Sequence, residues 1–229
     1  MISRARPGGV LFDAGGTLVR IHADRLAAAL RVRGVDPRDL GDAFWRTLIR
    51  LEDEFAPGVG EFSDWWSRWL GALAGGCGVP AHVMVEAYRE ADQAQHLWDD
   101  PLPGAAECLT RLRETGILVG VVSNADGRIA EALERAGLAE LLDVIVDSTV
   151  VGVYKPDPAI FDHALGPLGL EPADTWYLGD TVAYDAVAAD AAGLVSWVID
   201  HAGFHTVDHP RRVRSLTEFA DLVLGDSSE

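Results

Sequence analysis

The sequence predicts an α/β fold in which helices cover a parallel sheet and a helical segment is inserted near the start of the chain. Short apolar runs alternate with helical patterns over most of the chain, and this alternation indicates the parallel sheet. The alternation breaks between about residues 21 and 100, where the pattern is helical throughout. A chain of 229 residues is long enough for a core and a smaller second domain. We therefore expect a core domain of residues 1–20 and 101–229, and a helical domain of residues 21–100.

The composition excludes several kinds of partner. A formal net charge of −17 argues against a nucleic-acid surface, because such a surface needs a cluster of basic residues. No stretch approaches the ~20 apolar residues of a membrane span, and the short apolar run near the start lacks a small-residue cleavage site. The two cysteines, Cys77 and Cys108, lack the spacing of a metal or redox pair. We therefore expect a cytoplasmic protein that binds neither nucleic acid nor a membrane.

The first strand is expected at residues 9–12, a short apolar run that ends at Asp13 and is followed by a pair of glycines. Similar runs occur at four later places: residues 117–122, 142–146, 175–178 and 194–198. Ligands of open α/β sheets bind outside the carboxyl ends of the strands. Asp13, Ser123 and Asp180 each fall at such an end, so we expect them to face one crevice.

Helical spacing of apolar residues appears between these runs. One pattern ends before Gly137 and another before Gly169, and glycine commonly follows the end of a helix. The apolar positions of the two patterns are Ile129, Leu133 and Ala136, and then Ile160, Phe161, Ala164, Leu165 and Leu168. Helices placed between strands support a parallel sheet.

Two apolar stripes at helical spacing characterise residues 21–100. They consist of Phe44, Leu48, Leu51 and Phe55, and of Phe62, Trp65, Trp66, Trp69 and Leu73. Pro57-Gly58 and Gly75-Gly76 are expected to separate helices, and residues 101–104 mark the return to the sheet domain. Aromatic stripes of this kind usually pack a core, so we assign these tryptophans to packing and not to a ligand site.

Two clusters of residues have the features of an anion site. Asp13 leaves the first strand and enters a loop whose glycines allow backbone N–H groups to approach an anion. Ser123 and Asn124 end a later strand just before a helix, and hydroxyl groups and helix N-termini hold phosphate oxygens. Taken singly, these residues are equally well explained as helix caps or loop residues.

Two further clusters supply charge. Lys155 lies among prolines in residues 152–158 and presents one cation beside a helix start. Asp180 and Asp185 place two carboxylates around a turn after a strand. Hard oxygen ligands in that arrangement suit Mg²⁺.

In this order, the four clusters resemble the four sequence motifs of the haloacid dehalogenase-like hydrolase superfamily. The resemblance implies a Rossmann-like core, and the helical insert looks like the cap domain of that superfamily. It extends to residues 103–105, to residues 155–161, and to Asp185 ahead of residues 191–193. The match covers most of the chain.

The resemblance implies a role for each motif residue. Asp13 would be the nucleophile that takes the phosphoryl group from a small phosphorylated metabolite and forms an aspartyl-phosphate. Thr17 would shape its loop, and Ser123 would donate a hydrogen bond to a phosphoryl oxygen. Lys155 would neutralise charge on the phosphoryl group and on Asp13, while Asn124 would support the site.

The same resemblance implies a Mg²⁺ cofactor. The metal would be held by the carboxylate of Asp13, the backbone carbonyl of Gly15 and the carboxylate of Asp180. Asp185 would be a further ligand or would support the others. The implied activity is that of a magnesium-dependent phosphatase.

Position 15 departs from the phosphatase pattern of the superfamily, which carries a second aspartate there as general acid and base. Gly15 keeps the carbonyl but lacks the proton shuttle, and positioned acid–base catalysis is typically worth ~10²–10⁴-fold in rate. We therefore expect slow turnover of alkyl phosphates. Three explanations are open: a weakened or specialised phosphatase, an enzyme whose leaving group needs no proton, or a non-catalytic relative that binds a phosphometabolite. We favour the first.

Two other branches of the superfamily also lack an acid at this position. A 2-haloacid dehalogenase releases halide without protonation, but that branch works without a metal and would not require both Asp180 and Asp185. Phosphonate hydrolysis uses a cap lysine as a Schiff base, and no lysine occurs between Asp13 and Lys155. The dehalogenase is therefore the main alternative activity.

One further group, His201, His205 and His209, recurs every four residues and would suit a transition metal on a helix. Gly203 and Pro210 predict a loop instead, so we expect solvated histidines. The sequence leaves the substrate and the oligomeric state open.

Overall fold

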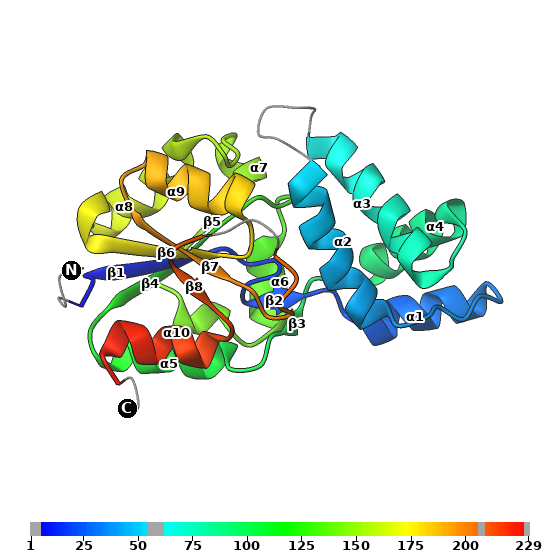
Figure 1. Cartoon of the computed structure of the whole chain (residues 1–229), viewed down its shortest axis with the longest axis horizontal. Helices are drawn as coiled ribbons and strands as arrows, with labels where there is room; N and C mark the ends of the chain where they lie inside the picture. The colour runs from blue at the N-terminus through cyan, green and yellow to red at the C-terminus, as the bar shows by residue number, and fades with distance from the viewer. Residues whose placement is uncertain (1–5, 55–61, 206–208, 227–229) are drawn as a thin grey trace.

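A six-stranded sheet forms the centre of the computed structural model, which describes residues 6–54, 62–205 and 209–226. The strand order is β5-β4-β1-β6-β7-β8, and every neighbouring pair is parallel (Figure 1). The strands are β1 (Gly9–Phe12), β4 (Leu118–Ser123), β5 (Val144–Asp147), β6 (Thr175–Gly179), β7 (Val195–Ile199) and β8 (Arg212–Val213). The parallel α/β sheet expected from the sequence is confirmed.

Successive residues of each strand point to opposite faces of the sheet. In β1, Val10 and Phe12 belong to a hydrophobic cluster on one face, whereas Leu11 belongs to a cluster on the other. In β6, Leu178 joins the first cluster and Tyr177 the second. All five side chains are fully buried because helices cover both faces.

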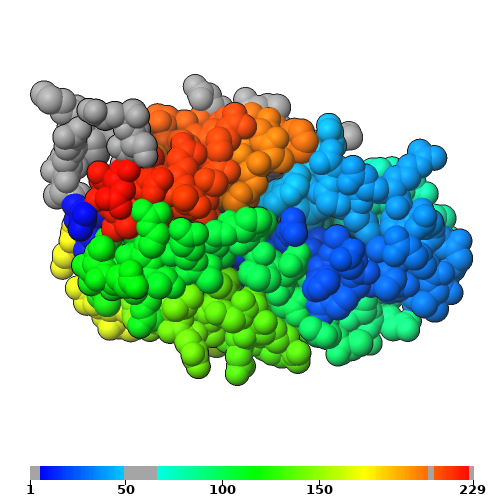
Figure 2. Space-filling view, turned by 90° about the horizontal axis from the view of Figure 1, so that it is seen from below, coloured from blue at the N-terminus to red at the C-terminus, as the bar shows by residue number. Residues whose placement is uncertain are grey.

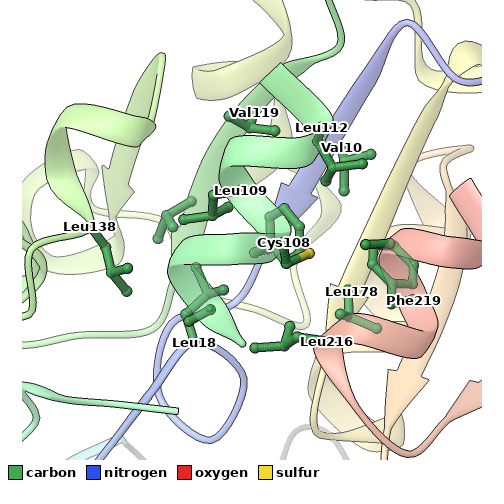
Figure 3. Packing of buried hydrophobic residues seen from close by; sticks show 14 of the residues in the cluster. Val10, Leu18, Cys108, Leu109, Leu112, Val119, Leu138, Leu178, Leu216 and Phe219 are labelled. Carbon is green, nitrogen blue, oxygen red and sulfur yellow. The ribbon is translucent and has the colours of Figure 1, made fainter. Parts of the chain in front are cut away.

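The helices of the core divide between the two faces (Figure 1). The first cluster is covered by α5 (Ala105–Glu114), α6 (Ile129–Arg135) and α10 (Leu216–Leu224). The second is covered by the short helix η2 (Pro158–Phe161) with α8 (Asp162–Leu168) and α9 (Val187–Ala191). Figure 3 shows Cys108 and Leu112 of α5 packed close to Val10 of β1 and Phe219 of α10.

One strand end agrees with the sequence expectation and one turn differs from it. Ser123 ends β4, as expected, and pairs with Asp147 of β5. The turn expected after Asp180 is a π-helix, η4 (Val182–Ala186). Its first turn is held reciprocally: the Asp185 N–H donates to Thr181 Oγ1 at 3.2 Å, and the Thr181 N–H donates to Asp185 Oδ2 at 3.0 Å.

The inserted segment is helical, as expected, and has a hydrophobic core of its own within residues 21–98. Its helices are α1 (Ala23–Val32), α2 (Leu40–Glu54), α3 (Phe62–Cys77) and α4 (Ala81–Ala94). Phe44, Leu48, Trp69 and Leu73 of the two apolar stripes are buried in that core, and Trp66 packs against it. The other stripe positions, Leu51, Phe55, Phe62 and Trp65, lie outside the described side chains. Figures 1 and 2 show the insert as a lobe at one end of the molecule.

The expectation that Gly75-Gly76 separates two helices is wrong, because both glycines lie inside α3. A Cβ on Gly76 would lie only 3.3 Å from the Cβ of Ala43, so glycine lets α2 and α3 pack closely. This packing outweighs the low helix propensity of glycine. The break expected at Pro57-Gly58 lies outside the described residues.

A short antiparallel ribbon joins the insert to the core. It pairs β2 (Val19–Arg20) with β3 (Asp100–Pro101), and Arg20 Nε donates to Asp100 Oδ2 at 2.8 Å.

Among the described helices, no single one is both long enough and apolar enough to cross a membrane. Two consecutive helical segments, Trp66–Cys77 and Ala81–Ala94, reach that length and composition together, but the chain bends by 114° between them.

Candidate active site

The carboxyl ends of β1, β4 and β6 meet at one edge of the sheet and bring Asp13, Ser123 and Asp180 to the same region. β1 lies between the other two strands, and the Asp13 N–H donates to the carbonyl of Leu178 in β6 at 2.8 Å. Ser123 lies close enough to the Asp13 carboxylate to lower the pKa of that carboxyl. All three polar side chains are buried. The topology therefore places a carboxylate, a hydroxyl and a second carboxylate on neighbouring strand ends.

Lys155 reaches into this edge from the segment that follows β5. Its Nζ donates to Asp13 Oδ1 at 2.7 Å, to Asp185 Oδ1 at 2.6 Å and to Tyr177 Oη at 2.8 Å. An ammonium group has three donors and no acceptor, so all three donors are used. Lys155 is the only lysine in the sequence and is 4% exposed. All three hydrogen-bond donors of its ammonium group are therefore bonded to protein side chains.

Asn124 fixes the backbone from which Lys155 projects. Its Nδ2 donates to the Lys155 carbonyl at 2.9 Å, and its Oδ1 accepts from the Lys155 N–H at 2.8 Å. Both main-chain groups of one residue are thus held by one amide side chain. Asn124 follows β4 directly, so it links the end of that strand to the Lys155 segment.

Tyr177 belongs to this cluster, although its place in the sequence indicates only an apolar strand. Its hydroxyl lies 3.0 Å from the carbonyl of Val122 and 2.9 Å from Asp185 Oδ1, besides accepting from Lys155. The available signal was a phenol in an otherwise apolar buried strand, because a buried tyrosine hydroxyl needs a polar partner.

Asp185 is held by the protein at both carboxylate oxygens. Oδ1 accepts from Lys155 and Tyr177, and Oδ2 accepts from the N–H and the hydroxyl of Thr181. These bonds leave Asp185 oriented toward Lys155. This geometry suits a residue that positions the lysine.

Burial and charge pairing together set the protonation of the cluster. Burial raises the pKa of Asp13 to about 6 against the opposing effect of the Lys155 ammonium. Burial also opposes the charge of Lys155, but the carboxylates of Asp13 and Asp185 hold its pKa above the usual value. Burial disfavours ionised Asp185 too, yet Lys155 holds the pKa of that carboxyl below its usual range. At neutral pH the site therefore contains an ionised lysine between two ionised carboxylates.

Asp180 lies against the loop that follows Asp13. A Cβ on Gly16 would fall 2.2 Å from Asp180 Oδ2, and Gly16 has a φ of 83°. Only glycine fits both the close approach and this backbone conformation. Thr17, the next residue, has a fully buried hydroxyl that finds no hydrogen-bond partner among the described residues. The loop thus contains a buried hydroxyl without a partner among the described residues, one position after the glycine that faces Asp180.

The donor set fits a magnesium ion bound partly through water. No three histidine, cysteine, aspartate or glutamate side chains among the described residues form a metal-binding group by themselves. Mg²⁺, however, usually takes one or two carboxylates and keeps several waters. Asp13 and Asp180 are two such carboxylates, and three buried carboxylates with one ammonium leave an excess of negative charge. The chemistry therefore suits a divalent cation.

The described residues of the histidine segment, 200–205 and 209–211, form neither helix nor strand, as expected, and no metal-binding group is found among the described residues. His201 is half-buried and packs against the ring of Trp45, with 5.3 Å between centroids. His209 Nδ1 lies 2.9 Å from the Arg211 carbonyl, and its Nε2 lies 3.3 Å from Ser196 Oγ. His209 is therefore bonded within the core domain.

Comparison with known proteins decides the family. A family model described as haloacid dehalogenase-like hydrolase matches residues 8–193. The chain belongs to the haloacid dehalogenase-like hydrolase family. It is 32% identical over 217 residues to glyceraldehyde 3-phosphate phosphatase of Methanopyrus kandleri, covering 92% of this chain and 91% of the relative. It is 27% identical over 230 residues to (S)-2-haloacid dehalogenase 4A of Burkholderia cepacia, covering 93% of each.

A solved structure of a haloacid dehalogenase-like hydrolase from Bacillus subtilis has the same fold. Its TM-score is 0.69 at 18% sequence identity, covering 96% of this chain and 100% of that one. The family and the fold class indicated by the four motifs are therefore confirmed, and this haloacid dehalogenase-like protein is an enzyme of the hydrolase class.

Proposed function

We propose that this hydrolase is a magnesium-dependent phosphatase that acts on a small phosphorylated metabolite through an aspartyl-phosphate on Asp13. The observation that carries the proposal is the buried cluster in which Lys155 holds the carboxylate of Asp13 while Asp180 lies against the same loop. A carboxylate that is buried, ionised and fixed in orientation is suited to nucleophilic attack. The relative from Methanopyrus kandleri, named as a glyceraldehyde 3-phosphate phosphatase, supports the substrate class.

The proposed reaction has two steps. A carboxylate oxygen of Asp13 bonds to phosphorus while the bond from phosphorus to the leaving oxygen breaks. Water then attacks the phosphorus of the aspartyl-phosphate, which releases inorganic phosphate and restores Asp13. Ser123 and the buried hydroxyl of Thr17 would donate to phosphoryl oxygens. Lys155 keeps Asp13 ionised and oriented, and Asn124 and Asp185 keep Lys155 in place.

The residues that would hold Mg²⁺ are Asp13, Asp180 and the backbone carbonyl of Gly15. When bound, the ion would neutralise charge on the phosphoryl oxygens. We assign Asp185 to positioning Lys155 and not to the metal, because both of its oxygens already accept hydrogen bonds from the protein. The segment 21–100 would act as the cap over this site, with the β2–β3 ribbon as its connection.

Release of phosphate from p-nitrophenyl phosphate, measured with magnesium and with EDTA, tests the proposal. We expect turnover that depends on magnesium and is absent in Asp13→Asn. Phosphate release by Asp13→Asn at the wild-type rate would reject the nucleophile. Magnesium-independent hydrolysis in the wild type would reject the cofactor.

A 2-haloacid dehalogenase is the second candidate, because Gly15 offers no acid and a halide leaves without a proton. The relative named (S)-2-haloacid dehalogenase 4A supports this alternative. The same enzyme would then release chloride from 2-chloropropionate, and EDTA would have no effect. Measuring both products on one preparation separates the two activities.

A further inference from the structure

The indole ring of Trp98 lies directly on Gly15, two residues after the proposed nucleophile. A Cβ on Gly15 would lie 3.0 Å from Cζ3 and 3.1 Å from Cε3 of that ring. The φ of Gly15 is not in the positive range, so its backbone would accept a side chain. Lack of space, and not backbone conformation, therefore favours glycine at this position.

Trp98 is fixed in this position by the core of the insert. Its Nε1–H donates to Tyr88 Oη at 3.0 Å. Its ring packs against those of Phe44, Trp66 and Trp69, with centroid distances of 5.5, 5.8 and 5.7 Å. Side chains in a close-packed interior resist displacement, because a shift of one ring forces its neighbours to move. The ring therefore cannot leave Gly15 without disturbing several aromatic neighbours.

The surface that Trp98 presents to Gly15 offers no proton donor. The atoms nearest Gly15 are ring carbons, and the one N–H of the indole is directed to Tyr88. Burial raises the pKa of the Tyr88 phenol well above its usual value. Neither residue therefore replaces the acid that position 15 lacks.

We propose that Trp98 is a specificity-determining residue: it fills the space of a side chain at position 15 and selects flat leaving groups that depart as stable anions, as in aryl phosphates. This inference rests on the phosphatase activity proposed above. When the bond between phosphorus and the leaving oxygen breaks, that oxygen keeps the electron pair. With no acid at position 15, it leaves without a proton, so weakly basic leaving groups leave fastest. An aromatic leaving group also gains contact with the indole face or edge.

The contact itself is tested by unfolding, which needs no activity. Gly15→Ala is expected to lower Tm by about 2–4 °C in the wild-type background, because the new methyl group meets the indole. In a Trp98→Phe background, which lacks the outer ring carbons, the same substitution should cost little or nothing. Equal shifts in the two backgrounds would overturn the proposal. If the phenylalanine ring still touches Gly15, the same comparison of Tm is made with Trp98→Leu in place of Trp98→Phe.

Trp69→Phe is the matched control. Trp69 belongs to the same aromatic core, but the three atoms nearest the Gly15 Cβ position all belong to Trp98. We expect the cost of Gly15→Ala to be the same with and without Trp69→Phe. The proposal would be overturned if Trp69→Phe reduced the Tm cost of Gly15→Ala as much as Trp98→Phe does. That result would mean that any loosening of the insert core relieves the cost.

The substrate class is tested with esters of graded leaving-group basicity. We expect kcat/KM to fall by about 10²-fold or more from p-nitrophenyl phosphate through phenyl phosphate to ethyl phosphate. Trp98→Phe should raise KM several-fold for the aryl esters and leave that for ethyl phosphate unchanged. Gly15→Asp should increase ethyl phosphate turnover only when combined with Trp98→Phe, which makes room for the carboxylate.

Two results would overturn this selection by Trp98: similar kcat/KM for aryl and alkyl esters, or a full gain from Gly15→Asp alone. Absence of phosphate release from every ester would overturn the phosphatase proposal and the substrate class together. The unfolding cycle would then still decide whether Trp98 excludes a side chain from position 15, so the two failures are distinguishable.

Discussion

Lys155 is the residue on which the geometry of the site depends, because one ammonium group joins side chains from three parts of the chain. Its donors reach Asp13 after β1, Tyr177 in β6 and Asp185 in η4. Removing one partner leaves a buried charged donor unsatisfied, which typically costs about 1–3 kcal/mol or more. A change at any of these partners should therefore affect the others.

Tyr177→Phe should lower the free energy of unfolding by about 1–3 kcal/mol, because Lys155 loses an acceptor in a fully buried site. Activity should fall as well, since Lys155 would be less well oriented toward Asp13. Urea unfolding and phosphate release measure the two effects. Tyr154→Phe is the control: its hydroxyl bonds Thr149 at an exposed position, and its loss should change stability little. Equal effects of both substitutions would contradict the role given to Tyr177.

Asp13 should make stability depend on pH in the metal-free protein. Burial raises its folded-state pKa to about 6, whereas an unfolded aspartate has a pKa of ~3.9. The folded state then binds the proton more tightly, so the contribution of this group is complete below about pH 4 and is lost as pH rises through about 6. Urea unfolding of the wild type and Asp13→Asn in EDTA should show the wild type losing stability relative to the variant over that range. Parallel pH curves would contradict this account.

Asp180→Asn should weaken apparent magnesium affinity at least about tenfold, because it removes one of the two anionic ligands proposed for the ion. Titration of activity against magnesium measures this loss. The rise in Tm produced by magnesium gives a second measure that needs no turnover. Asp162→Asn, at an exposed position on α8, is the matched control and should leave both unchanged. Unchanged magnesium dependence in Asp180→Asn would remove Asp180 from the metal site.

At the scale of elements, the loop between β4 and α6 organises the site through side chains that bind backbone groups. Asp147, at the end of β5, accepts from the N–H of Gly127 in this loop, from that of Ile129 at the start of α6, and from that of Thr149. Asn124, at the start of the loop, holds Lys155. The segments that follow β4 and β5 are therefore joined by hydrogen bonds in both directions.

Asn124→Ala should lower kcat about tenfold or more while leaving magnesium affinity unchanged. The substitution frees both main-chain groups of Lys155, and small misplacement of a catalytic group is costly in rate. Steady-state kinetics at several magnesium concentrations separate the two quantities. Asn124→Asp keeps the acceptor for the Lys155 N–H and should lose less activity than the alanine variant. An alanine variant with wild-type kcat would show that Asn124 does not position Lys155.

At the scale of the whole molecule, the insert rests on the loop that follows Ser123. Arg128, at the start of α6, donates to the carboxylate of Asp92 in α4, and His96 Nε2 lies 3.6 Å from Asp126 Oδ1. These contacts join the two domains in addition to the covalent ribbon. The loop that follows Ser123 and contains Asn124 therefore also contacts the end of the insert.

Arg128→Ala should loosen this contact with little effect on overall stability. The arginine is 38% exposed, and pairs of this kind are typically worth about 0–1 kcal/mol. We expect faster hydrogen exchange at the end of α4, unchanged exchange in β1 and β4, and a several-fold rise in KM. Arg135→Ala, which breaks an exposed pair within α6, should change neither exchange nor KM. Unchanged exchange in α4 would contradict the contact.

The sequence by itself determined the fold class, the helical insert and the residues at the strand ends. These depend on local patterns: apolar runs give strands, helical spacing gives helices, and parallel strands direct their carboxyl ends to one edge. Local pattern alone was therefore enough to place Asp13, Ser123 and Asp180 in one region. The order of four motifs likewise indicated the family.

Only the tertiary structure decided how side chains from distant segments meet. Tyr177 looks apolar in the sequence, and its hydroxyl acquires a polar role only because Lys155 and Asp185 are brought to it. Trp98 lies outside the two apolar stripes of the insert, yet it packs in the same core, and one edge of its ring also covers Gly15. The contact joins residues 83 positions apart, and local periodicity contains no information on such distances. The packing of the insert on the core therefore decided what covers Gly15, two residues after the proposed nucleophile.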